Sequence, residues 1–301
     1  MISGHSGGTA IGARILRLRL FTRLSLFSSA VAGSLATHVV YDPDMPAQRM
    51  PRLLMWFGSR YEHLLMRTIF WLADRNWLQH PVAKKGINLI AALVMRVVSG
   101  EVLSYDEGQE MVNALFDSGA TVAIGTCPCR RARRIYSTDV PNETDMVFGK
   151  WAREYIANYP EYYREISREE ALEMLDVFDR SGFVRQVYGF NDSHGVAFVM
   201  CNCADDVCIP LHAMRTIGIN AYEKGRSRAV VDAELCKGTA SCGRCLARCR
   251  FNARMPEGKA AVIEENCMGC GLCVTGCPSG ASSLSRVPGA HLHYARDLLK
   301  P

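Results

Sequence analysis

Apolar side chains recur at helical spacing in the first third of the chain. Between residues 47 and 100 they return every three or four positions with polar residues between them, a pattern that predicts an amphipathic helix. The stripe consists of Leu53, Phe57, Tyr61, Leu64, Leu65, Ile69 and Leu72. His80-Pro81 interrupts it, and the apolar residues that follow predict a second helix over 86–98. We expect both helices to be buried in a core; a stripe left on the surface would instead mark a docking face.

The middle of the chain, residues 101–228, contains one pattern twice, at a constant offset of 63 positions. The first copy holds Ser104, Glu107, Glu110, Met111, Ser118 and Gly119, and the second holds Ser167, Glu170, Glu173, Met174, Ser181 and Gly182. A Ser followed three residues later by Glu is a capping box that starts a helix. Ser-Gly is a helix stop at which Gly can adopt the left-handed conformation. Each copy therefore predicts a helix.

β-rich runs follow each predicted helix, at 121–124 in the first copy and at 183–188 and 196–200 in the second. Each copy then ends in Cys-x-Cys, as Cys127-Pro128-Cys129 and Cys201-Asn202-Cys203. Helix starts of this kind are common and can coincide by chance. We favour a duplicated helix–strand–Cys-loop unit whose two loops face each other, so that four thiolates converge on one metal centre.

The overall composition excludes several classes of protein. Hydrophobic residues make up 49% of the 301 residues and charged ones 22%, so a core can form and a wholly disordered chain is excluded. The net charge of +5 is mild and the basic residues are spread over several elements, which argues against nucleic-acid binding. The apolar runs are too short to cross a bilayer, and no Gly-rich nucleotide-binding loop follows a predicted strand.

The N-terminal arm, residues 1–46, is basic. Its first 41 residues contain no acidic residue but include Arg14, Arg17, Arg19 and Arg23. This composition is typical of a targeting peptide, of a basic segment on a membrane surface, or of a solvated arm. The sequence does not separate these three. The second would give a cytoplasmic protein a peripheral contact with the inner membrane face.

Thirteen cysteines are the most informative number in the composition. An odd count at short spacings in a chain of this length does not fit a disulfide framework, which belongs to small oxidised domains. Thiolate ligation of metal in a reducing compartment fits better. We therefore expect a cytoplasmic metal-binding protein.

The strongest motif lies near the C-terminus. Cys267, Cys270, Cys273 and Cys277-Pro278 have the spacing C-x2-C-x2-C-x3-C-P, which binds [4Fe–4S] clusters in bacterial ferredoxins. Its glycines let the backbone wrap closely, so that three sulfurs reach three corners of one cubane. An imperfect partner run lies upstream, with three extra residues in its first gap: Cys236-x5-Cys242-x2-Cys245-x3-Cys249.

Together the two runs resemble the two-cluster bacterial-type ferredoxin fold over residues 229–285. The resemblance implies that one cluster is held by Cys236, Cys242, Cys245 and Cys277, and the other by Cys267, Cys270, Cys273 and Cys249. A strand over 260–263 would lie between the two halves. Four arginines stand in the upstream run or just after it: Arg244, Arg248, Arg250 and Arg254. They either favour the reduced clusters and raise their potential or solvate a helix face.

Five cysteines remain outside this module: Cys127, Cys129, Cys201, Cys203 and Cys208. Buried, inert thiols are one explanation. Alternate residues of an extended stretch point to the same side, so both sulfurs of each Cys-x-Cys pair can face one centre. We favour a third metal centre.

Residues 105–285 as a whole resemble a set of 4Fe–4S-binding proteins in which Cys-x-Cys-Arg and Cys-Asn-Cys segments precede a two-cluster ferredoxin module. The matching stretches are 127–130, 143–149, 167–171 and 201–203. Asp145 stands where such proteins tend to carry a further Cys. The resemblance thus suggests a carboxylate, a harder and more labile ligand, at this position; the alternative is an ordinary loop or cap residue.

Four arginines follow the first Cys pair directly: Arg130, Arg131, Arg133 and Arg134. Cations beside thiols lower the thiol pKa values and so favour metal binding. They would equally suit an anionic substrate or an acidic partner.

We therefore predict an α+β fold. Its parts are the arm, a helical region over 47–100, a mixed middle domain over 101–228, a two-cluster ferredoxin domain over 229–285 and a tail over 286–301. The predicted function is electron transfer through two [4Fe–4S] clusters to or from a third centre, with a redox partner that has an acidic docking surface. Two alternatives stay open: an oxidoreductase whose middle-domain cluster has an open coordination site for a small molecule, and a redox sensor or cluster-handling protein. The sequence leaves open whether the protein is an enzyme and identifies no catalytic residue.

Overall fold

A computed structural model describes residues 52–73, 75, 80–95, 98–190, 197–218 and 222–292. The chain divides into two units, Met1–Val40 and Tyr41–Pro301, and every described residue belongs to the second. The basic arm predicted for 1–46 lies outside the described residues, as do positions 293–301 of the predicted tail.

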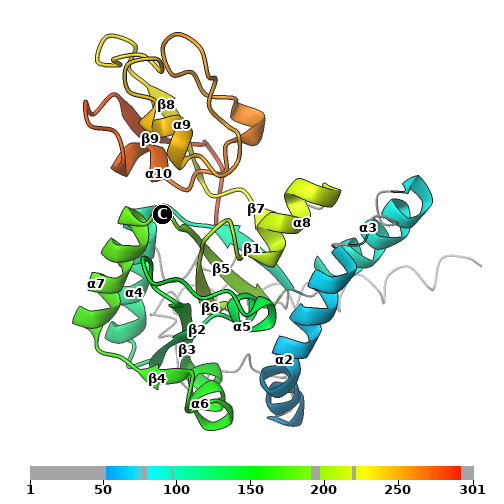
Figure 1. Cartoon of the computed structure of the whole chain (residues 1–301). Coiled ribbons are helices and arrows are strands. Elements are labelled where there is room, and N and C mark those ends of the chain that lie inside the picture. The colour runs from blue at the N-terminus through cyan, green and yellow to red at the C-terminus, as the bar shows by residue number, and fades with distance from the viewer. Residues whose placement is uncertain are drawn as a thin grey trace, which may run out of the picture. The chain divides into compact units, whose positions relative to one another are not determined.

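A seven-stranded mixed sheet forms the centre of the described structure (Figure 1). Its order is β4-β2-β3-β6-β5-β1-β7, and all neighbours are antiparallel except β1 and β7. The strands are β1 (Val98–Val102), β2 (Val122–Thr126), β3 (Glu143–Phe148), β4 (Tyr163–Glu165), β5 (Val184–Phe190), β6 (Ala197–Cys203) and β7 (Tyr222–Glu223). Strands β2, β5 and β6 correspond to the three β-rich runs predicted from the sequence.

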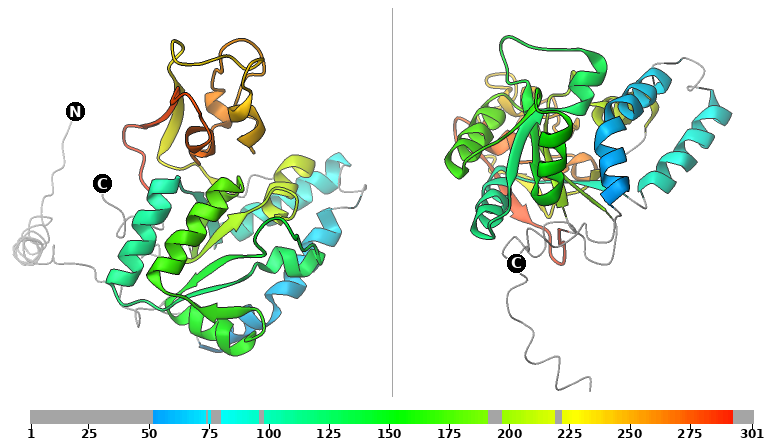
Figure 2. Two further views of the ribbon diagram at one scale, coloured as in Figure 1. Left: turned by 60° about the vertical axis from the view of Figure 1, so that its left-hand side comes forward. Right: turned by 90° about the horizontal axis from the view of Figure 1, so that it is seen from below.

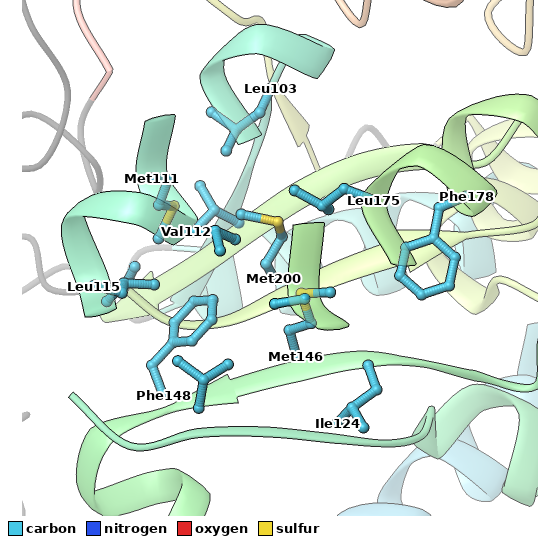
Figure 3. Close-up of a cluster of buried hydrophobic side chains, with 14 of the residues drawn as sticks. Leu103, Met111, Val112, Leu115, Ile124, Met146, Phe148, Leu175, Phe178 and Met200 are labelled. Atoms are coloured by element: carbon cyan, nitrogen blue, oxygen red, sulfur yellow. The ribbon is translucent and has the colours of Figure 1, made fainter. Parts of the chain in front are cut away.

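Helices cover both faces of this sheet. Successive side chains of a strand point to opposite faces, and here both faces carry apolar side chains that helices bury. The helices are α4 (Tyr105–Asp117), α5 (Pro128–Arg133), α6 (Gly149–Asn158), α7 (Arg168–Arg180) and α8 (Ile209–Ile217). Ile124 and Met200 point into a core beneath α4 and α7, which lie side by side (Figure 2; the core is drawn in Figure 3). Ala123 and Val199 point the other way, into a core with α6.

The repeated pattern produces two matching helices. Helices α4 and α7 both have 13 residues, and the hydroxyls of Ser104 and Ser167 accept hydrogen bonds from backbone N–H groups three residues on. Gly119 and Gly182 follow the helices with the same φ of +74°, a conformation that favours glycine. The copies differ afterwards: β2 runs directly into Cys127, whereas β5 first pairs with β6, which itself contains the second Cys pair.

Two N-terminal helices, α2 (Arg52–Ala73) and α3 (Pro81–Met95), confirm the helical spacing but not the expected burial. The stripe is largely exposed, with Leu53, Phe57, Tyr61, Leu64, Leu65 and Ile69 all on the surface. Helix α2 contacts α5, α6 and α8 through another side, where the buried Ser59 accepts a hydrogen bond from the Asn158 amide. The expectation of a buried second helix was also wrong, because Val82, Leu89 and Ile90 of α3 are exposed.

A small two-stranded sheet forms the C-terminal part, from β8 (Ser227–Val231) and β9 (Ser282–Arg286), with short helices α9 (Arg244–Arg248) and α10 (Leu272–Thr275). The strand expected over 260–263 is absent from this described stretch: only an isolated bridge joins Arg254 to Val262. Buried ion pairing connects the small sheet to α4, since Arg226 Nε lies 2.6 Å from Glu107 Oε1. The described chain is thus a mixed α/β structure with a small C-terminal sheet, and none of its helices is long and apolar enough to cross a membrane.

Candidate metal centres

The C-terminal part contains two hollows, each lined by four cysteines. The first, here called the inner site, is lined by Cys249, Cys267, Cys270 and Cys273. The second, the outer site, is lined by Cys236, Cys242, Cys245 and Cys277. The structure therefore brings together the same two sets of four that the ferredoxin resemblance implies.

The backbone around these hollows suits sulfur ligands. The N–H groups of Ala229 and Ala253 point to the sulfurs of Cys267 and Cys249, at N···S distances of 3.5 and 3.3 Å. Gly269 has a φ of +80°, and a Cβ there would lie 2.3 Å from the Ser227 carbonyl oxygen. Only glycine fits this close approach, which holds the first Cys-x2-Cys loop against β8.

The thiols of the two sites differ in electrostatic environment. Burial raises the pKa of Cys270 in the inner site to about 12. In the outer site burial also raises the pKa of Cys277, but hydrogen bonds from Ser282, Ser279 and Ala281 outweigh it and lower the pKa to about 7. A buried thiolate needs positive charge beside it, and metal would supply that charge at the inner site.

No group of three or more His, Cys, Asp or Glu side chains in the described part of the chain is arranged to hold a single metal ion. A single ion gathers its ligands around one point. A [4Fe–4S] cluster is held by four cysteine thiolates, one for each iron corner, so its ligands stand farther apart. Four cysteines around a hollow fit that second requirement.

Of the four arginines named for this module, Arg254 is the one whose side chain hydrogen-bonds to a cluster cysteine within the described residues. Its side chain is 5% exposed, and Nη2 donates to Cys273 Sγ at 2.8 Å. Burial works against its charge, but the neighbouring thiols outweigh burial and raise the pKa of Arg254. Arg248 instead pairs with Asp179, and Arg250 with Asp205, so these two tie the module to the middle domain.

The five remaining cysteines gather in one place, here called the middle-domain site (Cys127, Cys129, Cys201, Cys203 and Cys208). Cys127 is hydrogen-bonded to Cys129, and Cys203 to both Cys201 and Cys208. Electrostatic interactions link Cys127 to Cys201 and Cys203, and Cys129 to Cys208. The two Cys-x-Cys segments therefore face each other, although 127–129 is the start of a helix and not an extended stretch.

Two helices begin at this site. Cys127 is the N-cap of α5 and Cys208 the N-cap of α8, and each is followed closely by Pro in the first turn. The Ile209 N–H donates to Cys129. Burial raises the pKa of Cys208 well above its ordinary value, and a hydrogen bond to Cys127 together with burial does the same for Cys129. Such thiols bind metal only when the ion itself displaces their protons.

Asp145 lies directly beside this cysteine group. It is 2% exposed on β3, and Cys201 Sγ donates to its Oδ1 at 3.1 Å. Its other oxygen accepts from the Tyr163 hydroxyl at 2.7 Å. Burial is the main cause that raises the pKa of Asp145. A buried carboxylate is thus placed where the resemblance suggests a further ligand.

The arginines after the first Cys pair are mostly engaged within the chain. Arg130 is buried and donates to the Ile135 carbonyl at 3.1 Å. Arg131 lies 4.5 Å from the ring centroid of Tyr159, and Arg133 lies 4.1 Å from that of Phe70 in α2. Arg134 is exposed in the left-handed conformation. Anion or partner binding by this group stays a prediction.

Sequence reasoning missed the aromatic residues around the middle-domain site. Tyr222 on β7 is hydrogen-bonded to Cys208, with 3.4 Å between Oη and Sγ, and Tyr188 on β5 interacts with four of the five cysteines. Glu62 on α2 accepts a hydrogen bond from the Tyr155 hydroxyl, and burial raises the pKa of Glu62 to about 7. None of these belongs to a local motif, so only the tertiary structure identifies them.

One comparison with known proteins gives a result. Residues 260–283 match the 4Fe-4S binding domain family. This stretch contains the complete C-x2-C-x2-C-x3-C run. The C-terminal part is therefore a 4Fe–4S binding domain, and it implies at least one [4Fe–4S] cluster. No curated protein and no solved structure matches the chain.

Proposed function

We propose that the protein transfers electrons through two [4Fe–4S] clusters, one in the inner site and one in the outer site. The observation that carries this proposal is the pair of separate hollows, each lined by four cysteines. Bound clusters would supply one-electron redox chemistry. The cysteines of the chain would supply the thiolate ligands. The residues around them would exclude water from the inner site and set the charge around each centre.

We further propose that the middle-domain site holds a third thiolate-bound metal centre. Its support is the convergence of five cysteines, three of them buried and two partly buried. Two of the five, Cys127 and Cys208, are the N-caps of α5 and α8. Soft thiolate ligands favour iron–sulfur clusters, zinc or Cu(I) over hard cations. Of these three, we propose an iron–sulfur cluster, because the site lies next to a 4Fe–4S binding domain and such a cluster can exchange electrons with it.

The redox partner in this proposal has an acidic docking surface. Cys242 of the outer site is exposed, and the exposed Lys237, Arg244 and Lys259 stand around the same hollow. A basic rim of this kind accelerates association with an acidic partner and makes it salt-dependent.

The alternative function is an oxidoreductase that acts on a small molecule at the middle-domain site. The observation in its favour is Asp145, a carboxylate in contact with Cys201 and Tyr163. A weaker ligand at one corner would leave a position that a substrate can take. Tyr163 would then be placed to donate a proton at that corner.

Electron paramagnetic resonance of the reduced chain, purified without air, tests these proposals together. We expect two interacting signals from the C-terminal part, of which Cys242→Ala removes one and Cys270→Ala the other. A third signal should survive both changes and disappear in Cys203→Ala. A third signal that shifts on addition of a small molecule would favour the oxidoreductase. Absence of any third signal, with iron only for two clusters, would contradict the middle-domain centre.

A further inference from the structure

The inner site and the middle-domain site are joined by one apolar cluster. Cys203 and Cys208 belong to the same group of packed buried side chains as Phe251 and Met268, and Cys249 and Cys270 pack against that group. The outer site connects differently: Cys245 packs against the cluster that contains Cys267 and Cys273. The three sites therefore lie in a series, with the inner site between the other two.

Two aromatic rings form the contact between the inner and middle-domain sites. The Tyr222 hydroxyl is 3.4 Å from Cys208 Sγ, and its ring is 6.4 Å from that of Phe251 at an angle of 82°. Phe251 in turn lines the inner hollow. An unbroken path of side chains thus runs from a thiol of one site to the wall of the other.

The backbone fixes this contact in place. Tyr222 lies on β7 of the large sheet, and Ser227, only five positions later, begins β8 of the small sheet. Within that connection the Gly225 N–H donates to the Met268 carbonyl at 3.0 Å. A Cβ on Gly225 would lie 2.4 Å from the Val102 carbonyl oxygen. The connection between β7 and β8 is therefore short, and at Gly225 it has no room for a side chain.

Buried positive charge is concentrated at the inner site. Arg254 donates to Cys273 at 2.8 Å while its Nη1 is buried without a hydrogen-bond partner among the described residues. Arg185, 2% exposed, interacts with Cys270 and has a buried Nε that also lacks such a partner. At the outer site the exposed Lys259 donates to the Cys236 backbone carbonyl. Arg254 also interacts electrostatically with Cys245 of the outer site, but its hydrogen bond goes to Cys273 of the inner site. Solvent screens an exposed charge far more than a buried one, so an added electron is stabilised more at the inner site.

We propose that electrons pass in one direction, from a one-electron donor protein to the outer site, then to the inner site, and through Tyr222 and Phe251 to the middle-domain site. Arg254 sets the direction of the first transfer, from the outer to the inner site, by holding the inner site at a higher reduction potential than the outer site. This inference rests on the proposed function. Each transfer would move one electron: with clusters bound, the centre held in the outer site would be oxidised as the centre held in the inner site is reduced, and the inner centre would in turn be oxidised as the middle-domain centre is reduced. No bond or proton is exchanged between sites.

A redox titration of the full chain under anaerobic conditions, followed by paramagnetic resonance, tests the direction. We expect the inner-site signal, identified by its loss in Cys270→Ala, to appear at a higher potential than the outer-site signal. Arg254→Gln should lower the inner-site reduction equilibrium constant about tenfold, which is about 59 mV for a one-electron couple. Arg286→Gln, which removes an exposed charge from the same module, should leave it unchanged.

Several outcomes would overturn the inference. An inner site with the lower potential would reverse the direction, and an unchanged inner-site potential in Arg254→Gln would remove the role of that cation. If Arg254→Gln fails to keep its cluster, Arg254→Lys retains the charge and should keep the wild-type order of potentials. If the wild type contains no iron and no sulfide, the proposed function fails. If it contains both but the inner site has a lower reduction potential than the outer site, only the proposed direction of electron transfer fails.

The aromatic contact has its own test. Phe251→Leu should slow reduction of the middle-domain site several-fold after rapid reduction of the outer site, followed by absorbance, while the iron content stays the same. Phe148→Leu, a matched change in the core beneath α4, should have no effect on that rate. An unchanged rate in Phe251→Leu would contradict the assigned path.

Discussion

Arg226 and Glu107 form an ion pair that is almost completely buried. The Nε–Oε1 distance is 2.6 Å, and the side chains are 7% and 8% exposed. Glu107 belongs to the first turn of α4 and also accepts from the Ser104 backbone N–H, while Arg226 immediately precedes β8. The start of one repeated helix is thus bonded to the base of the 4Fe–4S binding domain.

Glu107→Ala should destabilise the chain strongly, because it removes the closer of the two carboxylates that pair with the buried Arg226 guanidinium, the other being Glu110 at 3.9 Å. Removing one member of a buried pair costs about 3 kcal/mol or more of unfolding free energy. Asp117→Ala is the matched control: Asp117, at the other end of α4, forms an exposed ion pair with Arg168 of α7, and its loss should cost less than about 1 kcal/mol. Equal losses in urea unfolding would contradict a tight junction at Glu107.

The pH dependence of stability should carry the signature of Glu62. Burial raises its pKa to about 7 from an ordinary value of 4.5, so between these values the folded state binds more protons than the unfolded state. The unfolding free energy contributed by this group therefore falls as pH rises through that window and levels off above it.

Glu62→Gln should remove this fall, measured by denaturant unfolding at a series of pH values. Glu161→Gln, which changes an exposed carboxylate, serves as the control. A wild-type slope retained in Glu62→Gln would show that Glu62 is charged throughout the range.

Removal of iron should unfold the C-terminal part and leave the large sheet intact. The cluster of buried apolar residues around the inner site contains Ala229, Ala253, Cys267 and Cys273, so half of that core consists of cysteines. Without metal, little apolar surface remains to hold β8 and β9 together. Hydrogen exchange should show lost protection in β8 and β9 but retained protection in β2 and β3. Equal protection with and without iron would contradict this.

Asp145→Cys should make the middle-domain site hold its metal more firmly. The substitution places a softer thiolate beside Cys201 in the position of a carboxylate, and release of iron to a chelator should slow several-fold. The control Asp139→Cys changes an exposed acidic residue in the loop before β3. Identical release rates in Asp145→Cys and wild type would exclude Asp145 from the centre.

Local signals predicted the elements that depend on local chemistry. The Ser-x-x-Glu starts and Ser-Gly stops gave α4 and α7, because caps act within one turn. The spacing from Cys267 to Cys277 identified the 4Fe–4S binding domain. The periodicity of 53–72 gave a helix but not its environment, since an apolar stripe does not say what covers it.

Other features depend on contacts distant in sequence. Cys127-Pro128-Cys129 was expected to be extended, but Pro in the first turn is compatible with a helix start, and the helix α5 begins there. Arg254 could not be told from Arg248 and Arg250 by sequence, because their partners lie in different elements. Tyr222 is 14 positions from Cys208 and 29 from Phe251, and no local pattern joins the three.

Analysis of iron and acid-labile sulfide in freshly purified chain, kept without air throughout, tests the central claim most directly. The account predicts a brown protein with about eight irons and eight sulfides for the inner and outer sites, and additional iron for the middle-domain site. A colourless protein without sulfide would contradict it.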